Sequence, residues 1–196
     1  LMGGKMGLQK VILEGKTLSI KHPSDAMKAG IGYLPEDRQK QGLILDWGLG
    51  QNVTLSTLEK FTKFTVINRK AERERSKELL EKVKTKALSV FDKASSLSGG
   101  NQQKVIVAKV LNSDLKVVIL DEPTKGVDVG AKAQIYEIMS ELAAQGFGVI
   151  MISSEMPEVL GMADTILVMK EGRVSKIFAD ATGVTQEQIL EAAMNM

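Results

Sequence analysis

The sequence predicts an α/β fold, in which a mostly parallel sheet is flanked by helices. Two uninterrupted aliphatic runs, at 117–120 and 148–152, are typical of strands buried on both faces. Between them, residues 131–144 have helical periodicity. Strand–helix–strand order with a right-handed crossover gives a parallel sheet, and ligands bind such sheets at the carboxyl ends of the strands.

The first half of the chain predicts short elements joined by loops. Residues 23–30 indicate a short helix, with Ser24 as its N-cap and a glycine as its end. Residues 31–34 indicate a strand. Residues 35–50 indicate a loop, because three glycines interrupt them: Gly42, Gly48 and Gly50.

Residues 68–86 predict a solvated helix, since charges of both signs surround a narrow apolar stripe of Leu79, Leu80 and Val83.

The second half predicts regular elements with recognisable ends. The helix at 131–144 places four apolar side chains on one face: Ile135, Ile138, Met139 and Leu142. A helical turn is expected at 157–161. Strands at 166–169 and 174–178 flank Glu171 and Gly172, a typical hairpin turn. Thr185 and Gln188 form a capping box for a last helix.

Composition narrows the classes of function. The chain has 196 residues, which suits one domain, and its 43% hydrophobic and 26% charged residues are typical of a soluble protein. A net charge of +2 gives no basic surface for nucleic acid. With no cysteine and one histidine, His22, disulfides, thiolate chemistry and structural zinc are excluded, and His22 receives no role. No apolar run approaches the ~18 residues that cross a bilayer, and no signal peptide is evident, so a membrane role is expected to need a partner.

An acidic pair follows the first aliphatic run, where residues 117–124 read VVILDEPT. Asp121 and Glu122 are expected at the carboxyl end of the strand. There Asp121 suits Mg²⁺, directly or through water, because that ion prefers oxygen ligands. Glu122 suits the orientation and deprotonation of an attacking water. Taken alone, a solvated acidic turn explains the pair equally well.

A glycine-rich segment runs into a helix at 104–111, where residues 97–103 read LSGGNQQ. Gly99 and Gly100 let backbone N–H groups approach a ligand, and the positive helix end and the Ser98 hydroxyl suit a γ-phosphate. An ordinary serine N-cap after a turn is the simpler explanation of this motif alone.

The order of the motifs changes this balance. After the acidic pair come GVD at 126–128 and SSE at 153–155. In this order the sequence resembles an ABC ATPase, with 97–103 as the signature loop, 117–122 as the Walker B strand and 126–128 as the D-loop. The resemblance implies a P-loop NTPase-like core at 1–42 and 114–196 and an ABC-type helical subdomain at about 43–113. It also implies that Asp128 contacts the opposite ATP site of a dimer.

Longer matches narrow the resemblance to the C-terminal ATPase half of bacterial monosaccharide importers of the ribose, galactose and xylose type. They lie at 32–38, 97–103, 126–132 and 153–161. The resemblance implies ATP and Mg²⁺ as cofactors and a second ATPase half as partner. It further implies an inner-membrane permease, an indirect periplasmic sugar-binding protein, no nucleic acid, and a peripheral location on the cytoplasmic face of the inner membrane.

Three departures from the family pattern matter. No Gly-x-x-x-x-Gly-Lys-Ser/Thr loop is present, although residues 1–4, LMGG, resemble its opening, so most of the Walker A loop and its helix are missing. Glu36 stands where most ABC ATPases have glutamine, and Ser154 stands where they have the switch histidine. These departures indicate a weak or silent site on this domain's own Walker motifs, although retained Glu122 leaves hydrolysis there open.

The signature loop is intact, so the resemblance makes its residues the main functional candidates for completing the ATP site of a partner half: Ser98, Gly99, Gly100 and Gln102. Segment 35–50 is where the family contacts the permease, with Leu43, Ile44, Leu45 and Trp47 as an apolar surface; a plain surface loop is equally consistent with it. The alternatives are a soluble ABC ATPase acting outside transport and a non-catalytic regulatory module, which the missing phosphate loop favours and Glu122 disfavours.

Overall fold

The computed structural model describes residues 10–194, so residues 1–4, the expected opening of a phosphate loop, lie outside the described part. The described chain begins with a hairpin of β1 (Val11–Leu13) and β2 (Lys16–Leu18). Glu14 and Gly15 form its two-residue turn, both with positive φ, as a tight hairpin turn requires.

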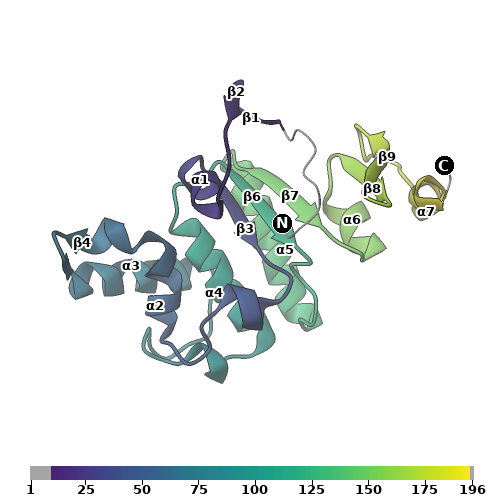
Figure 1. Cartoon of the computed structure of the whole chain (residues 1–196). Coiled ribbons are helices and arrows are strands. Elements are labelled where there is room, and N and C mark those ends of the chain that lie inside the picture. Colours follow the sequence, from purple (N-terminus) through teal and green to yellow (C-terminus); the bar gives the residue numbers. More distant parts are fainter. Residues whose placement is uncertain (1–9, 195–196) are drawn as a thin grey trace.

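A parallel sheet of β3 (Ile31–Leu34), β6 (Val117–Asp121) and β7 (Gly148–Ile152) forms the centre, in the order β3-β6-β7. Helices α4 (Gly99–Leu111) and α5 (Val129–Ala144) lie beside this sheet (Figure 1). They cover one of its faces, and the core there includes Leu34, Val118, Leu120 and the four predicted side chains of α5. The predicted α/β fold is confirmed.

The second face of the sheet is open within residues 10–194. Tyr33, Ile150 and Ile152 are 53%, 50% and 48% exposed. The prediction that β7 is buried on both faces is therefore wrong. The aliphatic run is real, but in the described part of the chain only one side of the strand has a packing partner.

The helical region comprises α2 (Leu49–Thr54), the 3₁₀ turn η2 (Leu55–Phe61), the small strands β4 (Thr62–Lys63) and β5 (Val66–Ile67), and α3 (Arg69–Lys82). The predicted charged helix is confirmed, and its apolar stripe is buried. A short turn, η3 (Ala94–Ser96), leads into α4. Since α4 packs against α2, α3 and β3, it joins the helical region to the sheet.

Two expectations for the first 50 residues are wrong. Helix α1 (Pro23–Lys28) is capped at His22 rather than Ser24, because the Asp25 carboxylate accepts the His22 N–H and Pro23 suits the first helical position. Part of the expected loop forms a π-helical turn, η1 (Arg38–Gly42). The Asp37 carboxylate caps this turn by accepting the backbone N–H of Lys40.

The C-terminal elements are α6 (Met156–Met162), β8 (Ile166–Lys170), β9 (Arg173–Phe178) and α7 (Gln186–Met194), which share a second apolar cluster. The predicted hairpin turn is confirmed, since Glu171 and Gly172 both have positive φ. The capping box is also confirmed, because Thr185 and Gln188 exchange hydrogen bonds of 3.0 and 3.4 Å. In the described residues, no helix has the length and apolar character needed to span a membrane.

Candidate functional site

The loops after the three parallel strands meet at one edge of the sheet. The Lys125 ammonium pairs with the Glu36 carboxylate at 2.5 Å, which joins the loop after β6 to the loop after β3. The Ser154 N–H donates to the Glu122 carboxylate at 2.9 Å, which joins the loops after β7 and β6. The structure thus brings together three predicted residues of these loops, Glu36, Glu122 and Ser154, and the fourth, Asp121, directly precedes Glu122 at the end of β6.

Asp121 ends β6, and its carboxylate is already engaged. The Tyr33 hydroxyl, on the neighbouring strand, donates to it at 2.8 Å. Burial, and then the hydrogen bond to Asp121, raise the pKa of Tyr33 to about 12, so the phenol stays protonated at neutral pH. No local pattern in the sequence singles out Tyr33, although the alternation of side chains along paired strands places it on the same sheet face as Asp121.

Glu122 is held in a strained backbone conformation. Its φ of 46° lies in the left-handed region, which a non-glycine residue rarely occupies. Its N–H donates to the Ile152 carbonyl at 2.8 Å, and its carboxylate accepts the Ser154 N–H. Strain of this kind persists only where neighbouring contacts enforce it, and it is concentrated at functional sites.

A buried carboxylate supports these loops from behind. Glu158 of α6 is 4% exposed and accepts hydrogen bonds from the Thr124 hydroxyl, at 3.0 Å, and from the Ser153 hydroxyl. The Ser153 oxygen also accepts the Glu155 N–H at 3.0 Å. Glu158 therefore ties α6 to the loop that carries Glu122 and to the loop that carries Ser154. The sequence motif at 153–161 contains this residue, but nothing in its spacing predicts the network.

The glycine-rich loop opens α4 with an uncapped end. Ser98 is exposed and stands at the N-cap, yet its side chain makes no capping hydrogen bond. Instead, its oxygen accepts the Asn101 side-chain amide at 3.0 Å. Among residues 10–194, the first N–H groups of the 13-residue helix therefore have no capping side chain, and the positive end of the helix is open to an anion.

Packing constrains the two glycines of this loop differently. A Cβ on Gly100 would lie 2.5 Å from the Cβ of Ala131, so this position excludes a side chain whether or not a phosphate binds. A Cβ on Gly99 would lie 2.7 Å from Nη2 of Arg38, so a side chain there would have to displace the end of the arginine.

Gln102 lies apart from the other predicted signature residues. Its side chain is 4% exposed, and its amide nitrogen donates to the Ala94 carbonyl at 3.1 Å. This position disagrees with the expected phosphate contact, because a buried side chain supports the loop from inside and does not line its surface.

The turn after β6 packs against the same loop. Asp128 is the N-cap of α5 and accepts the Ala131 N–H at 3.0 Å. Arg38 of η1 donates to the carbonyls of Lys125 and Gly126, at 2.8 and 3.3 Å. Arg38 lies within the motif at 32–38, but its spacing predicts no role for it, because its partners are 87 and 88 residues away along the chain.

The described residues alone do not build a metal centre. No group of three or more histidine, cysteine or acidic side chains among residues 10–194 is placed to hold an ion. Asp121 fits an Mg²⁺ ligand only if other oxygens complete the coordination, as the phosphates of a bound nucleotide do.

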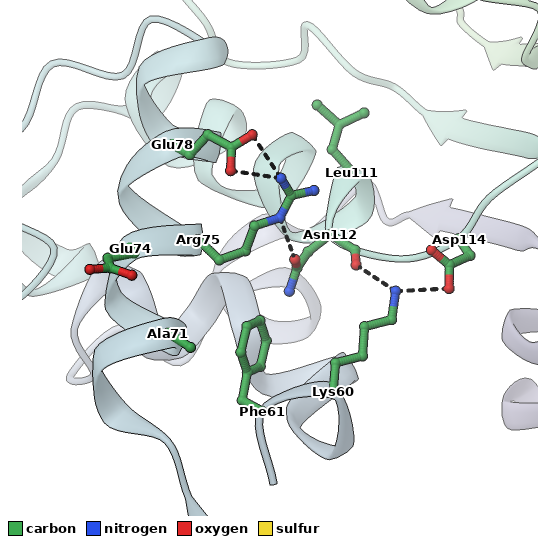
Figure 2. A pocket seen from close by; sticks show the side chains of 9 residues that line it. All are labelled: Lys60, Phe61, Ala71, Glu74, Arg75, Glu78, Leu111, Asn112 and Asp114. Atoms are coloured by element: carbon green, nitrogen blue, oxygen red, sulfur yellow. Dashed lines mark hydrogen bonds and ion pairs between the residues drawn. The ribbon is translucent and has the colours of Figure 1, made fainter.

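A surface pocket of ≈ 460 Å³ lies away from these loops, between α3, η2 and the end of α4 (Figure 2). Its charged side chains are largely paired. Arg75 binds Glu78 at 2.8 Å and Asn112 at 3.3 Å, and Lys60 binds Asp114 at 2.9 Å. The pairing indicates that these side chains stabilise the packing of the helical region and are not arranged to bind a ligand.

Comparisons with known proteins agree with the motif order. The family model described as ABC transporter matches residues 7–125. The xylose import ATP-binding protein XylG of Geobacillus kaustophilus is 47% identical over 98% of this chain and 38% of its own length. The ribose import ATP-binding protein RbsA of Hahella chejuensis is 46% identical over 94% of this chain and 37% of its own length. The chain therefore spans less than two-fifths of either relative.

Solved structures confirm the fold. The ATP-binding cassette MJ0796, in a dimeric post-hydrolysis state with ADP and Pi, superposes with a TM-score of 0.72 at 21% identity, covering 89% of this chain and 74% of that one. The cassette MJ1267 superposes with a TM-score of 0.74 at 22% identity, covering 93% and 75%.

Proposed function

The chain belongs to the ABC transporter family, and we propose that it is an ATP-binding domain that energises the import of a monosaccharide. In this proposal its signature loop completes an ATP site held by a second ATPase half, in the same polypeptide or in a dimer. The names of the XylG and RbsA relatives support sugar import. The observation that carries the proposal is the open N-terminus of α4 behind the exposed Ser98.

The signature loop has a simple task in this scheme. The Ser98 hydroxyl and the N–H groups at the start of α4 bind the terminal phosphate of ATP held by the partner half, with Gly99 and Gly100 keeping the approach free of side chains. ATP with Mg²⁺ supplies the reactive phosphoanhydride and the cation that neutralises its charge. Gln102 supports the loop through Ala94, and Asp128 fixes the adjoining turn at the dimer surface.

The domain's own Walker B side carries the acidic groups of an ATP site. Asp121 would contribute to Mg²⁺ binding, and Glu122 would orient a water and accept its proton, with the Ser154 N–H holding the carboxylate in place. The Glu36 carboxylate, however, is paired with the Lys125 ammonium. Their hydrogen bond is the main cause of the raised pKa of Lys125. Ser154 also stands where most members of the family have the switch histidine. We therefore propose that turnover depends mainly on the partner's site.

Part of segment 35–50 suits the permease contact. Ile44 and Trp47 are 39% and 41% exposed, whereas Leu43 and Gly50 are buried and unavailable to a partner. Docking there would place the domain on the cytoplasmic face of the inner membrane, below a permease fed by a periplasmic sugar-binding protein.

Reconstitution of the full-length protein with its permease in liposomes tests the proposal. We expect uptake of xylose or ribose that requires ATP and is lost in Ser98→Arg. The matched control is Ser24→Arg, the same change at an exposed serine of α1. ATP hydrolysis without any sugar uptake would favour a non-transport ATPase, and absence of nucleotide binding would favour a regulatory module.

A further inference from the structure

Arg38 occupies a position where three segments of the candidate site meet. It opens η1, immediately after the loop that carries Glu36. Its two terminal nitrogens donate to successive carbonyls, Nη1 to Lys125 at 2.8 Å and Nη2 to Gly126 at 3.3 Å. A guanidinium can bridge two acceptors because its donors form a rigid planar fork, whereas a lysine ammonium presents a single centre.

The same guanidinium lies against the signature loop. Its Nη2 would be only 2.7 Å from a Cβ on Gly99, so the charged group fills the space that a side chain at this position would need. Gly99 also approaches the other loop, since its Cβ would lie 3.3 Å from the Gly126 carbonyl oxygen. Arg38 is thus packed between the loop that opens α4 and the turn that precedes α5.

A contribution to folding stability does not explain why the Arg38 guanidinium is placed here. The Nε of Arg38 is buried and has no hydrogen-bond partner among residues 10–194. A buried donor without a partner is unfavourable, and such exceptions call for a functional explanation. The loop of Arg38 is also tied to the same turn by the separate Glu36–Lys125 ion pair. Two independent contacts therefore fix the loop after β3 to the loop after β6.

We propose that Arg38 is a positioning residue, which sets the signature loop and the 125–128 turn relative to each other and to segment 35–50. This inference rests on the proposed function, in which both loops face a partner's ATP and segment 35–50 faces the permease. Arg38 does not itself contact the nucleotide in this account. It therefore controls the rate of permease-coupled ATP hydrolysis and leaves the affinity for ATP nearly unchanged.

The test measures kcat and KM for ATP in the full-length protein with its permease, for wild type, Arg38→Gln and Arg38→Lys. We expect kcat to fall about tenfold in Arg38→Gln, because two charge-assisted hydrogen bonds are lost, while KM changes less than about twofold. Arg38→Lys should recover only part of kcat, because it keeps the charge and loses the fork. The matched control is Arg173→Gln, the same kind of change at an exposed arginine of β9, which lies outside the loops of the candidate site and outside segment 35–50.

A double-mutant cycle gives a second test that does not depend on the folding of Arg38→Gln. It compares the effect of Gly99→Ala on kcat in two backgrounds. Gly99→Ala in the wild-type background should displace the guanidinium, because its Cβ would lie 2.7 Å from Nη2, and should therefore lower kcat. In an Arg38→Ala background that obstacle is gone, and the same change should have a smaller effect.

Three outcomes overturn the inference: a wild-type kcat in Arg38→Gln, a loss that matches the fraction unfolded at the assay temperature, or equal effects of Gly99→Ala in both backgrounds. The Ser98→Arg variant, assayed alongside, separates this failure from failure of the proposed function. If Ser98→Arg has no effect, the proposed function itself is wrong.

Discussion

The signature side of the molecule and the Walker B side differ in how completely they are built. On the signature side, Gly99 and Gly100 pack tightly against Arg38 and Ala131, and Gln102 is buried beneath them. On the Walker B side, Asp121 lies on a sheet face whose neighbouring residues are half exposed, and Glu122 is held in a strained conformation. The difference indicates that the signature loop is held by close packing, whereas the acidic residues are held by hydrogen bonds at a half-exposed edge of the sheet.

The two faces of the sheet offer the largest contrast. Leu120→Ala, on the covered face, should lower the free energy of unfolding by about 2–5 kcal/mol, because it leaves a cavity in the core. Ile150→Lys, on the open face, should change it by less than about 0.5 kcal/mol. Urea unfolding of the purified chain measures both. A large loss for Ile150→Lys would mean that the open face is covered in solution.

Glu158 tests the support of the Walker B side. Glu158→Ala should cost about 3 kcal/mol, because it leaves the Thr124 and Ser153 hydroxyls without their acceptor in a buried site. Glu137→Ala removes a carboxylate from a surface pair with Lys84 and should cost less than about 1 kcal/mol. Comparable losses for the two variants would show that the buried network contributes no more than a surface ion pair.

Gly100 tests the packing of the signature side. Gly100→Ala should lower stability by about 1–3 kcal/mol, because its Cβ would meet the Cβ of Ala131 at 2.5 Å. Gly161→Ala, in α6, meets no atom within 4 Å and should raise stability by about 0.5–1 kcal/mol through its helix propensity. Thermal unfolding of both variants decides whether the glycine is required by packing.

Tyr33 gives the smallest effect. Since the pKa of Tyr33 is raised to about 12 in the folded chain, folding favours the neutral phenol. The neutral phenol therefore contributes to the free energy of unfolding, and this contribution is fully present below the usual tyrosine pKa near 10. It is lost as the pH rises through about 12. The chain has two tyrosines, so ultraviolet titration of Tyr136→Phe reports Tyr33 alone. A midpoint near 10 would show that neither burial nor the hydrogen bond to Asp121 acts on the Tyr33 hydroxyl in solution.

The sequence was sufficient for the parallel sheet, the order of the loops and the hairpin and capping box near the end. Each follows from a local pattern, such as aliphatic runs or Glu171 followed by Gly172. It did not reveal Tyr33, Arg38 or the role of Glu158, because their partners are distant along the chain and local spacing carries no information about them. The error for β7 has a related cause, since an aliphatic run reports the tendency to be buried and cannot report whether a covering element is present.

The most direct test of the central claim compares ATP hydrolysis by the full-length protein with its permease in wild type, Ser98→Arg and Glu122→Gln. We expect that Ser98→Arg abolishes turnover while Glu122→Gln has little effect, because in the proposed function this domain mainly completes its partner's site. A mild effect of Ser98→Arg together with loss of turnover in Glu122→Gln would show that the domain's own site performs the hydrolysis, which would contradict the account.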